Sequence, residues 1–186
     1  MTVPELDRLA DTEARAVLGS CCGARRWVDA MLAARPFGDR RGLMDAADRA
    51  DRALRRDDWL EAFAHPPRIG DFETLRERFG TAADWSRAEQ QGARDADERT
   101  LHALADGNTD YERRFGHRFI VCATGRGVDE MLAMLRERLA HDAALELEVA
   151  AGEQARITRL RLDRMIGHDP ASRSGSAGDA FPGGAP

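Results

Sequence analysis

Residues 127–140 read GVDEMLAMLRERLA, and this stretch shows the pattern that decides the fold. Its apolar side chains recur at intervals of three or four residues, and charged residues fill most of the other positions. The apolar set is Val128, Met131, Leu132, Leu135 and Leu139. An amphipathic helix of this kind buries its apolar stripe against neighbouring helices, so the stretch predicts one helix of a helical protein.

The same spacing extends over most of the chain, from about residue 3 to residue 166. Proline interrupts it, because proline cannot continue a helix and the residue before it resists helical geometry. We expect helices over residues 5–19, 21–35, 41–64 with a break near 56–58, 71–80, 84–107, 108–115, 127–140 and 141–166. In the last helix, the side chains expected to point inward are Leu145, Val149, Ile157, Leu160 and Met165.

Residues 118–125, RFIVCATG, are the exception to this pattern. This short, partly β-branched run ends at a glycine and fits either a lone extended segment or a buried turn of helix. The sequence therefore predicts an all-α, single-domain, multi-helix bundle with one short extended apolar segment, covering residues 1–166. Residues 167–186 are rich in Pro, Gly and Ser and are predicted to form a disordered tail.

The composition excludes several classes of function. The chain has 186 residues, 42% of them hydrophobic and 33% charged, as in an ordinary globular protein. All 28 of its basic residues are arginine, so lysine Schiff-base chemistry is excluded. The net charge of −5 argues against a nucleic-acid partner. Three cysteines without metal-binding spacing, and no apolar stretch as long as a membrane span, predict a cytoplasmic protein without a membrane partner.

Histidines are the first candidates for catalysis. The chain has five, and none forms a close pair that would bind a metal. His65, in AFAHPPRIGD, stands where two prolines must end a helix, and a rigid turn suits a general acid or base. A histidine that only faces the helix dipole is an equally good interpretation of this position. The other four are interpreted as structural: His102, His117, His141 and His168.

Six segments occur here in the order that is typical of one enzyme family. They are CCGARRWV, RPF, DWLEAFAHPPRIGD, SRAEQQG, NTDYERRFGHRFIVCATG and EQARITRLRL. In these segments the chain resembles the 2-oxo-4-hydroxy-4-carboxy-5-ureidoimidazoline (OHCU) decarboxylases, over about residues 9–165.

The resemblance implies an all-helical carbon–carbon lyase (a carboxy-lyase) that works without a metal or organic cofactor. Such an enzyme converts OHCU, a small-molecule carboxylate formed in urate breakdown, to (S)-allantoin. The substrate joins the carbon that carries the carboxylate to a C=N group, which accepts the electron pair left by CO2. Many members of the family form homodimers, so the resemblance leaves a homodimer open.

The resemblance also implies a set of site residues. The catalytic residues would be His65, Glu89 and Arg161. The substrate-binding residues would be Pro67, Ser86, Gln90, Phe119, Ile120, Val121, Cys122 and Ala123, the last five through their backbone N–H and C=O groups.

The chain departs from the family pattern at the histidine. The family usually places histidine directly before the proline that corresponds to Pro67, whereas here Pro66 fills that position and His65 comes one residue early. One residue turns a helical side chain by about 100°. Two interpretations follow. His65 swings into the site and the enzyme works, or the chain is a catalytically impaired relative that acts as a binding or scaffold protein.

Overall fold

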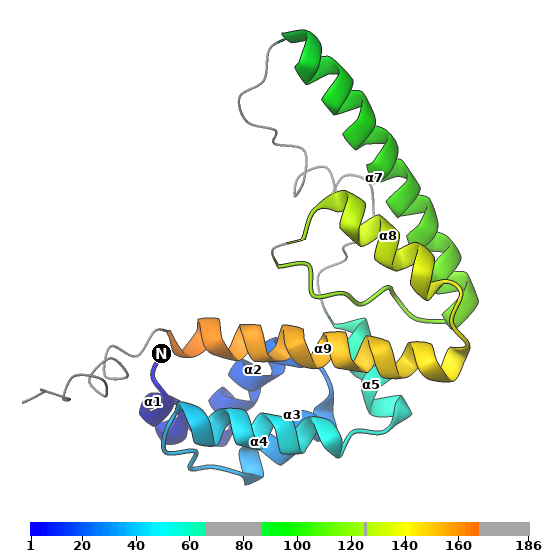
Figure 1. Ribbon diagram of the computed structural model, residues 1–186. Helices are drawn as coiled ribbons and strands as arrows, with labels where there is room; N and C mark the ends of the chain where they lie inside the picture. Colours follow the sequence, from blue (N-terminus) through cyan, green and yellow to red (C-terminus); the bar gives the residue numbers. More distant parts are fainter. Residues whose placement is uncertain (66–86, 125, 168–186) are drawn as a thin grey trace, which may run out of the picture.

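The computed structural model describes residues 1–65, 87–124 and 126–167, with the side chains of residues 87–97 left out. All regular structure in these residues is helical, which confirms the predicted all-α class (Figure 1). The helices are α1 (Val3–Arg8), α2 (Asp11–Cys21), α3 (Arg25–Ala33), α4 (Arg40–Arg52), α5 (Arg56–Ala64), α7 (Arg87–Phe115), α8 (Val128–Arg138) and α9 (Ala143–Ile166). The expected helix over residues 71–80 and the expected tail from residue 168 lie outside the described residues.

The first expected helix is two helices, so that prediction is wrong. A capping box begins α1, since the Thr2 hydroxyl accepts from the Glu5 N–H and the Glu5 carboxylate accepts from the Thr2 N–H. The helix then ends because Arg35 donates from Nη1 to the carbonyl oxygens of Leu6 and Leu9, at 3.2 and 3.1 Å. This partner lies in a later connection, so local periodicity could not predict the break.

The expected boundary at Asn108 is also wrong, because α7 runs unbroken from Arg87 to Phe115. Gly107 lies inside this helix at its contact with α8. A Cβ added there would stand 2.6 Å from a methyl carbon of Leu135. Glycine at this position therefore permits close helix packing and does not end the helix.

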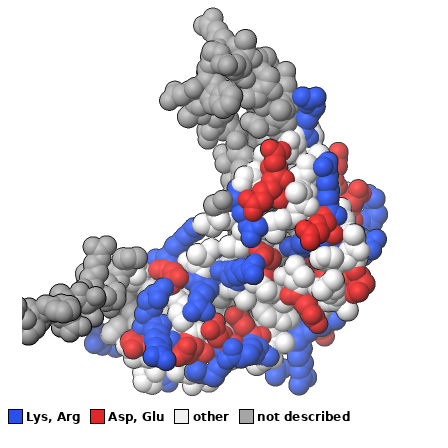
Figure 2. Space-filling view, in the orientation of Figure 1, with Lys and Arg blue, Asp and Glu red and all other residues white. Residues whose placement is uncertain are grey.

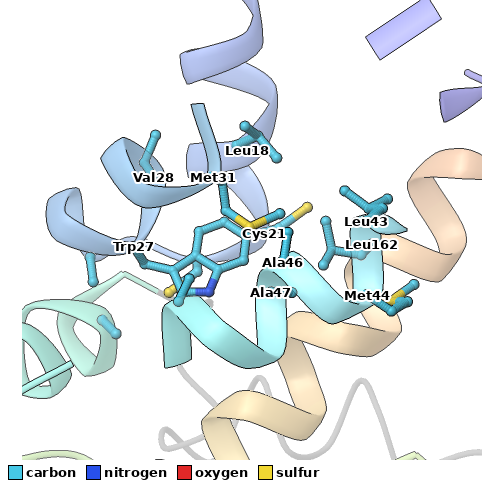
Figure 3. Close-up of a cluster of buried hydrophobic side chains, with 14 of the residues drawn as sticks. Leu18, Cys21, Trp27, Val28, Met31, Leu43, Met44, Ala46, Ala47 and Leu162 are labelled. Atoms are coloured by element: carbon cyan, nitrogen blue, oxygen red, sulfur yellow. The ribbon is translucent and has the colours of Figure 1, made fainter. Parts of the chain in front are cut away.

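One cluster of buried side chains joins α1–α5 and α9. Trp27 and Met31 on α3 and Leu43 on α4 have no exposed surface, and Figure 3 shows them gathered with Leu162 of α9. A second cluster joins α7, α8 and the segment over residues 119–123. Its fully buried members include Leu104 on α7 and Leu135 on α8. Ile120 packs in the first cluster while its neighbours in the chain pack in the second.

The buried face of α9 agrees only in part with the expected one. Ile157 and Met165 are half-buried against the first cluster, whereas Leu145, also expected inside, is 44% exposed. The buried positions of α9 are Glu146, Ala150, Glu153, Gln154, Thr158, Leu162 and Ile166. Most of this face is polar, so an apolar stripe could not identify it.

The described surface carries both charge signs side by side, with no large patch of either sign on the face in Figure 2. No helix among the described residues is long and apolar enough to cross a membrane. The three cysteines, Cys21, Cys22 and Cys122, are free thiols.

Candidate active site

The segment predicted to contact the substrate, residues 119–123, has neither helical nor strand structure and crosses between the two clusters. Protein side chains bind three of its backbone groups. The Ile120 carbonyl accepts from Arg138 Nη1 at 2.7 Å, and the Cys122 N–H donates to Glu153 Oε2 at 2.7 Å. The Cys122 carbonyl accepts from Arg126 Nε at 3.1 Å.

Val121 lies between these bound residues. Within the described part of the chain, its N–H and C=O have no hydrogen-bond partner. The segment therefore has one backbone donor and one backbone acceptor without a partner among the described residues.

A buried ion-pair network holds this segment in place. Arg138 and Glu146 are 3% and 0% exposed, and Arg138 Nε donates to Glu146 Oε1 at 2.9 Å. The Tyr111 hydroxyl also donates to Glu146, and His141 Nδ1 lies 2.8 Å from Glu146 Oε2. The Arg138 guanidinium lies over the ring of Phe119, 4.6 Å from its centroid. Arg138 therefore ties the substrate-facing segment to α9.

The charge states of this network follow from its contacts. Burial by itself raises the pKa of Glu146, but hydrogen bonds from Arg138 and Tyr111 and the charge of Arg138 outweigh it and hold that pKa below its usual value. Burial, followed by the Glu146 hydrogen bond, raises the pKa of the Tyr111 phenol. The network is therefore a carboxylate surrounded by Arg138, Tyr111 and His141.

Arg161 lies half-buried on α9, eight residues beyond Glu153. Its Nη1 donates to the Cys21 carbonyl at 3.1 Å, at the end of α2. Two turns earlier on the same helix, Gln154 is 1% exposed and its Nε2 lies 3.4 Å from Thr158 Oγ1. The predicted substrate arginine is therefore placed by the backbone of another element.

His65 ends α5 as its C-cap residue and is exposed. Its ring lies against Gly23, where a Cβ would stand 2.0 Å from His65 Cδ2. Gly23 is two residues from Cys21, the residue that holds Arg161. The structure therefore brings the predicted histidine and arginine to the same connection, between α2 and α3.

The remaining predicted residues are only partly described. Glu89 and Gln90 lie in the first turn of α7, with their side chains outside the description, and Ser86 and Pro67 lie outside it altogether. The predicted contact between His65 and Glu89 therefore stays a prediction. No group of three or more histidine, cysteine or acidic residues in the described part of the chain could hold a metal ion.

His117, which the sequence predicts to be structural, lines a cavity. The cavity, of about 330 Å³, is lined by residues of α5 and of the end of α7: Leu60, Phe63, Ala64, Glu112, Gly116, His117 and Arg118. Arg118 Nη1 donates to the Ala64 carbonyl at 3.3 Å and so joins the end of α5 to the start of the substrate-facing segment. The aromatic residues of NTDYERRFGHRF around His117 were the available signal for a half-buried histidine.

The chain is similar in sequence to two known proteins. Uric acid degradation bifunctional protein TTL of Arabidopsis thaliana is 34% identical over 150 residues, which are 78% of this chain and 45% of that protein. The 2-oxo-4-hydroxy-4-carboxy-5-ureidoimidazoline decarboxylase of Amia calva is 39% identical over 59 residues, which are 32% of this chain and 34% of that protein. The chain thus spans less than half the length of these two relatives.

Two solved structures share the fold. A crystal structure of OHCU decarboxylase in the presence of (S)-allantoin matches with a TM-score of 0.59 at 31% identity, over 80% of this chain and 95% of that one. A crystal structure of (S)-allantoin synthase matches with a TM-score of 0.62 at 20% identity, over 89% of this chain and 54% of that one. A family model described as OHCU decarboxylase matches residues 7–163. Since that match covers most of the chain, the chain belongs to the OHCU decarboxylase family.

Proposed function

We propose that this chain decarboxylates 2-oxo-4-hydroxy-4-carboxy-5-ureidoimidazoline to (S)-allantoin without a cofactor. The observation that carries the proposal is the set of backbone contacts of residues 119–123 within a chain of this family. Three protein contacts hold this segment, and the N–H and C=O of Val121 have no partner among the described residues. A ureidoimidazoline ring carries both N–H donors and carbonyl acceptors, so it matches one backbone donor beside one backbone acceptor.

The reaction requires the protein to orient the substrate and to transfer protons. The C=N group of the substrate accepts the electron pair that CO2 leaves behind, so no cofactor is needed as an electron sink. Arg161 would bind an anionic group of the substrate, and Glu89, Gln90, Ser86 and Pro67 would complete the site. Preorganised donors of this kind stabilise the charge that develops in the transition state. The acid/base role falls to a histidine at the end of α5, where the sequence assigns it to His65.

The test is a coupled assay that starts from urate. Urate oxidase and hydroxyisourate hydrolase generate the unstable substrate, and circular dichroism follows (S)-allantoin in the presence and absence of the protein. We expect rapid growth of the (S)-allantoin signal. Arg161→Gln should lower kcat/KM by about 10²-fold or more, because it removes a charged contact to the substrate. Arg164→Gln is the matched control, since Arg164 is an exposed arginine on the same helix.

Slow decay to racemic product, equal to that of the blank, would contradict the proposal. It would favour the alternative in which the chain is an impaired relative that binds a partner. Equal activity of wild type and Arg161→Gln would support the enzymatic function but show that Arg161 is not part of the site.

A homodimer and a cytoplasmic location stay predictions. The three free thiols are compatible with a reducing compartment.

A further inference from the structure

Two of the three side chains that hold residues 119–123 are both charged and buried. Arg138 on α8 donates from Nη1 to the Ile120 carbonyl at 2.7 Å. Glu153 on α9 is 4% exposed, and its Oε2 accepts the Cys122 N–H at 2.7 Å. A hydrogen bond to an ionised group is about twice as strong as a neutral one, and burial strengthens it further. Arg138 and Glu153 are therefore the firm anchors of this segment.

Each anchor is itself held by a side chain of opposite charge. Arg138 donates from Nε to Glu146 Oε1 at 2.9 Å, and Arg156 donates from Nη1 to Glu153 Oε1. A side chain fixed in this way holds its next partner in one orientation. The groups that the anchors bind on the segment are therefore fixed as well.

Each anchor binds a peptide unit that includes a backbone group of Val121. The Ile120 carbonyl and the Val121 N–H belong to one peptide unit, and the Val121 carbonyl and the Cys122 N–H belong to the next. Both peptide bonds are trans, and the N–H and C=O of a planar trans unit point in opposite directions. Arg138 therefore directs the Val121 N–H away from itself, and Glu153 directs the Val121 carbonyl away from itself.

The charges of the anchors also strengthen these two Val121 groups. A guanidinium at the carbonyl of a peptide unit draws electrons toward the oxygen, so the N–H of that unit becomes a stronger donor. A carboxylate at the N–H has the reverse effect, so the carbonyl becomes a stronger acceptor. Val121 is 3% exposed, and its N–H and C=O have no partner among the described residues. Buried backbone groups without a partner are rare, so this pair points to a ligand.

We propose that Arg138 and Glu153 are positioning residues of this decarboxylase. They orient and polarise the N–H and the carbonyl of Val121, which bind a C=O and an N–H group of the substrate. Both side chains act through the backbone, and neither touches the substrate. The inference rests on the proposed function, since it takes residues 119–123 to be the segment that contacts the substrate.

The first experiment compares two variants of Glu153 in the coupled circular dichroism assay. Glu153→Ala removes the acceptor and the charge, whereas Glu153→Gln keeps an oxygen that accepts the Cys122 N–H. We expect Glu153→Ala to raise KM and to lower kcat/KM by about 10²-fold, as a misplacement of about 1 Å does. Glu153→Gln should lose less, because it restores the contact without the charge. Glu148→Ala, at an exposed glutamate of α9, is the control and should match wild type.

The separation of KM from kcat distinguishes positioning from a purely structural role. A partly unfolded variant has fewer active molecules, which lowers the apparent kcat and leaves KM unchanged. Titration calorimetry with (S)-allantoin, the expected product, gives the same readout at equilibrium, and we expect a higher Kd for Glu153→Ala. An active wild type with the same KM and Kd as Glu153→Ala would overturn the inference and keep the proposed function. Wild type that neither exceeds the blank nor binds (S)-allantoin would overturn both.

Arg138 is tested without leaving a buried charge unpaired. Arg138→Met combined with Glu146→Met removes both charges, and replacing a buried ion pair by apolar side chains is often neutral for stability. The double variant should raise KM as Glu153→Ala does. Arg136→Met, at an exposed arginine of α8, should leave KM unchanged. A folded double variant with the wild-type KM would overturn the assignment of Arg138.

A measurement on wild type serves if the variants do not fold. Amide-nitrogen and carbonyl-carbon NMR of valine-labelled protein is recorded with increasing (S)-allantoin. We expect both Val121 resonances to shift with saturation, while those of Val3 on α1 stay fixed. Saturable binding that leaves both Val121 resonances unmoved would overturn the inference. A shift of only one would overturn the assignment of the anchor behind the other.

Discussion

Glu146 is a carboxylate with no exposed surface, and its partners decide its effect on stability. Glu146→Gln leaves the Arg138 guanidinium buried without a counter-ion, which costs about 3–5 kcal/mol in a buried pair. We expect that loss in the free energy of unfolding at pH 7, measured by urea denaturation. Glu148→Gln is the matched control, since Glu148 is exposed two residues away on α9, and it should change by less than about 0.5 kcal/mol.

The same residue predicts a pH dependence. The pKa of Glu146 in the folded protein lies below its usual value near 4.5, so the unfolded chain binds more protons in that range. Its contribution to stability is present above about pH 4.5 and is lost as the pH falls through the lower, folded value. Wild type should therefore lose stability in acid more steeply than Glu146→Gln. Parallel acid limbs for the two proteins would contradict this assignment.

The burial of charged residues such as Glu146 could not be predicted from the sequence. The apolar stripe of α8 could be predicted, because three of its buried residues, Met131, Leu132 and Leu135, are hydrophobic and pack by spacing alone. The burial of Arg138 on the same helix could not. The buried face of α9 could not, because Glu146 and Glu153 are buried only by virtue of partners on other elements. His117 is a similar case, since it is half-buried by the rings of Phe63 and Tyr111. A local sequence pattern cannot predict such pairings.

At the scale of elements, the connection between α2 and α3 positions the end of α5. Gly23 permits this, because a Cβ at residue 23 would stand 2.0–2.2 Å from Cβ, Cγ and Cδ2 of His65. These atoms are the root of the side chain, so α5 itself must shift to relieve the clash. Gly23→Ala should therefore lower the free energy of unfolding by about 1–3 kcal/mol, as overpacking does.

A double-mutant cycle checks this contact. His65→Gly removes all three clashing atoms, so the pair Gly23→Ala with His65→Gly should recover at least half of the loss. Gly19→Ala in α2 is the control, because a Cβ there meets nothing within 4 Å. Additive losses in the double mutant would show that the two residues do not touch.

Most of the helices could be predicted from the sequence. Their ends could not, because they depend on contacts between elements, such as that of Gly23 with His65 and that of Arg35 with Leu6 and Leu9.

At the scale of the whole molecule, two buried clusters share one connection. Ile120 packs with the first cluster, Phe119 and Val121 pack with the second, and Arg138 of α8 binds Glu146 of α9. Figure 1 shows α7 and α8 standing away from the helices below, with α9 running under them. Because the linking residues are buried, neither cluster can open without exposing them, and we expect the molecule to unfold as one unit.

Cavity mutations in each cluster test this expectation. Leu43→Ala in the first and Leu104→Ala in the second both remove a side chain with no exposed surface, which costs about 2–5 kcal/mol. Scanning calorimetry should show a single transition in both variants, moved to lower temperature by about 2–4 °C for each kcal/mol. Leu145→Ala, at a leucine that is 44% exposed, should leave the transition nearly in place. Two separate transitions, with Leu104→Ala lowering the temperature of only one of them, would contradict this expectation. They would show that the α7–α8 unit folds independently of the rest, and that the site between the clusters opens when that unit unfolds.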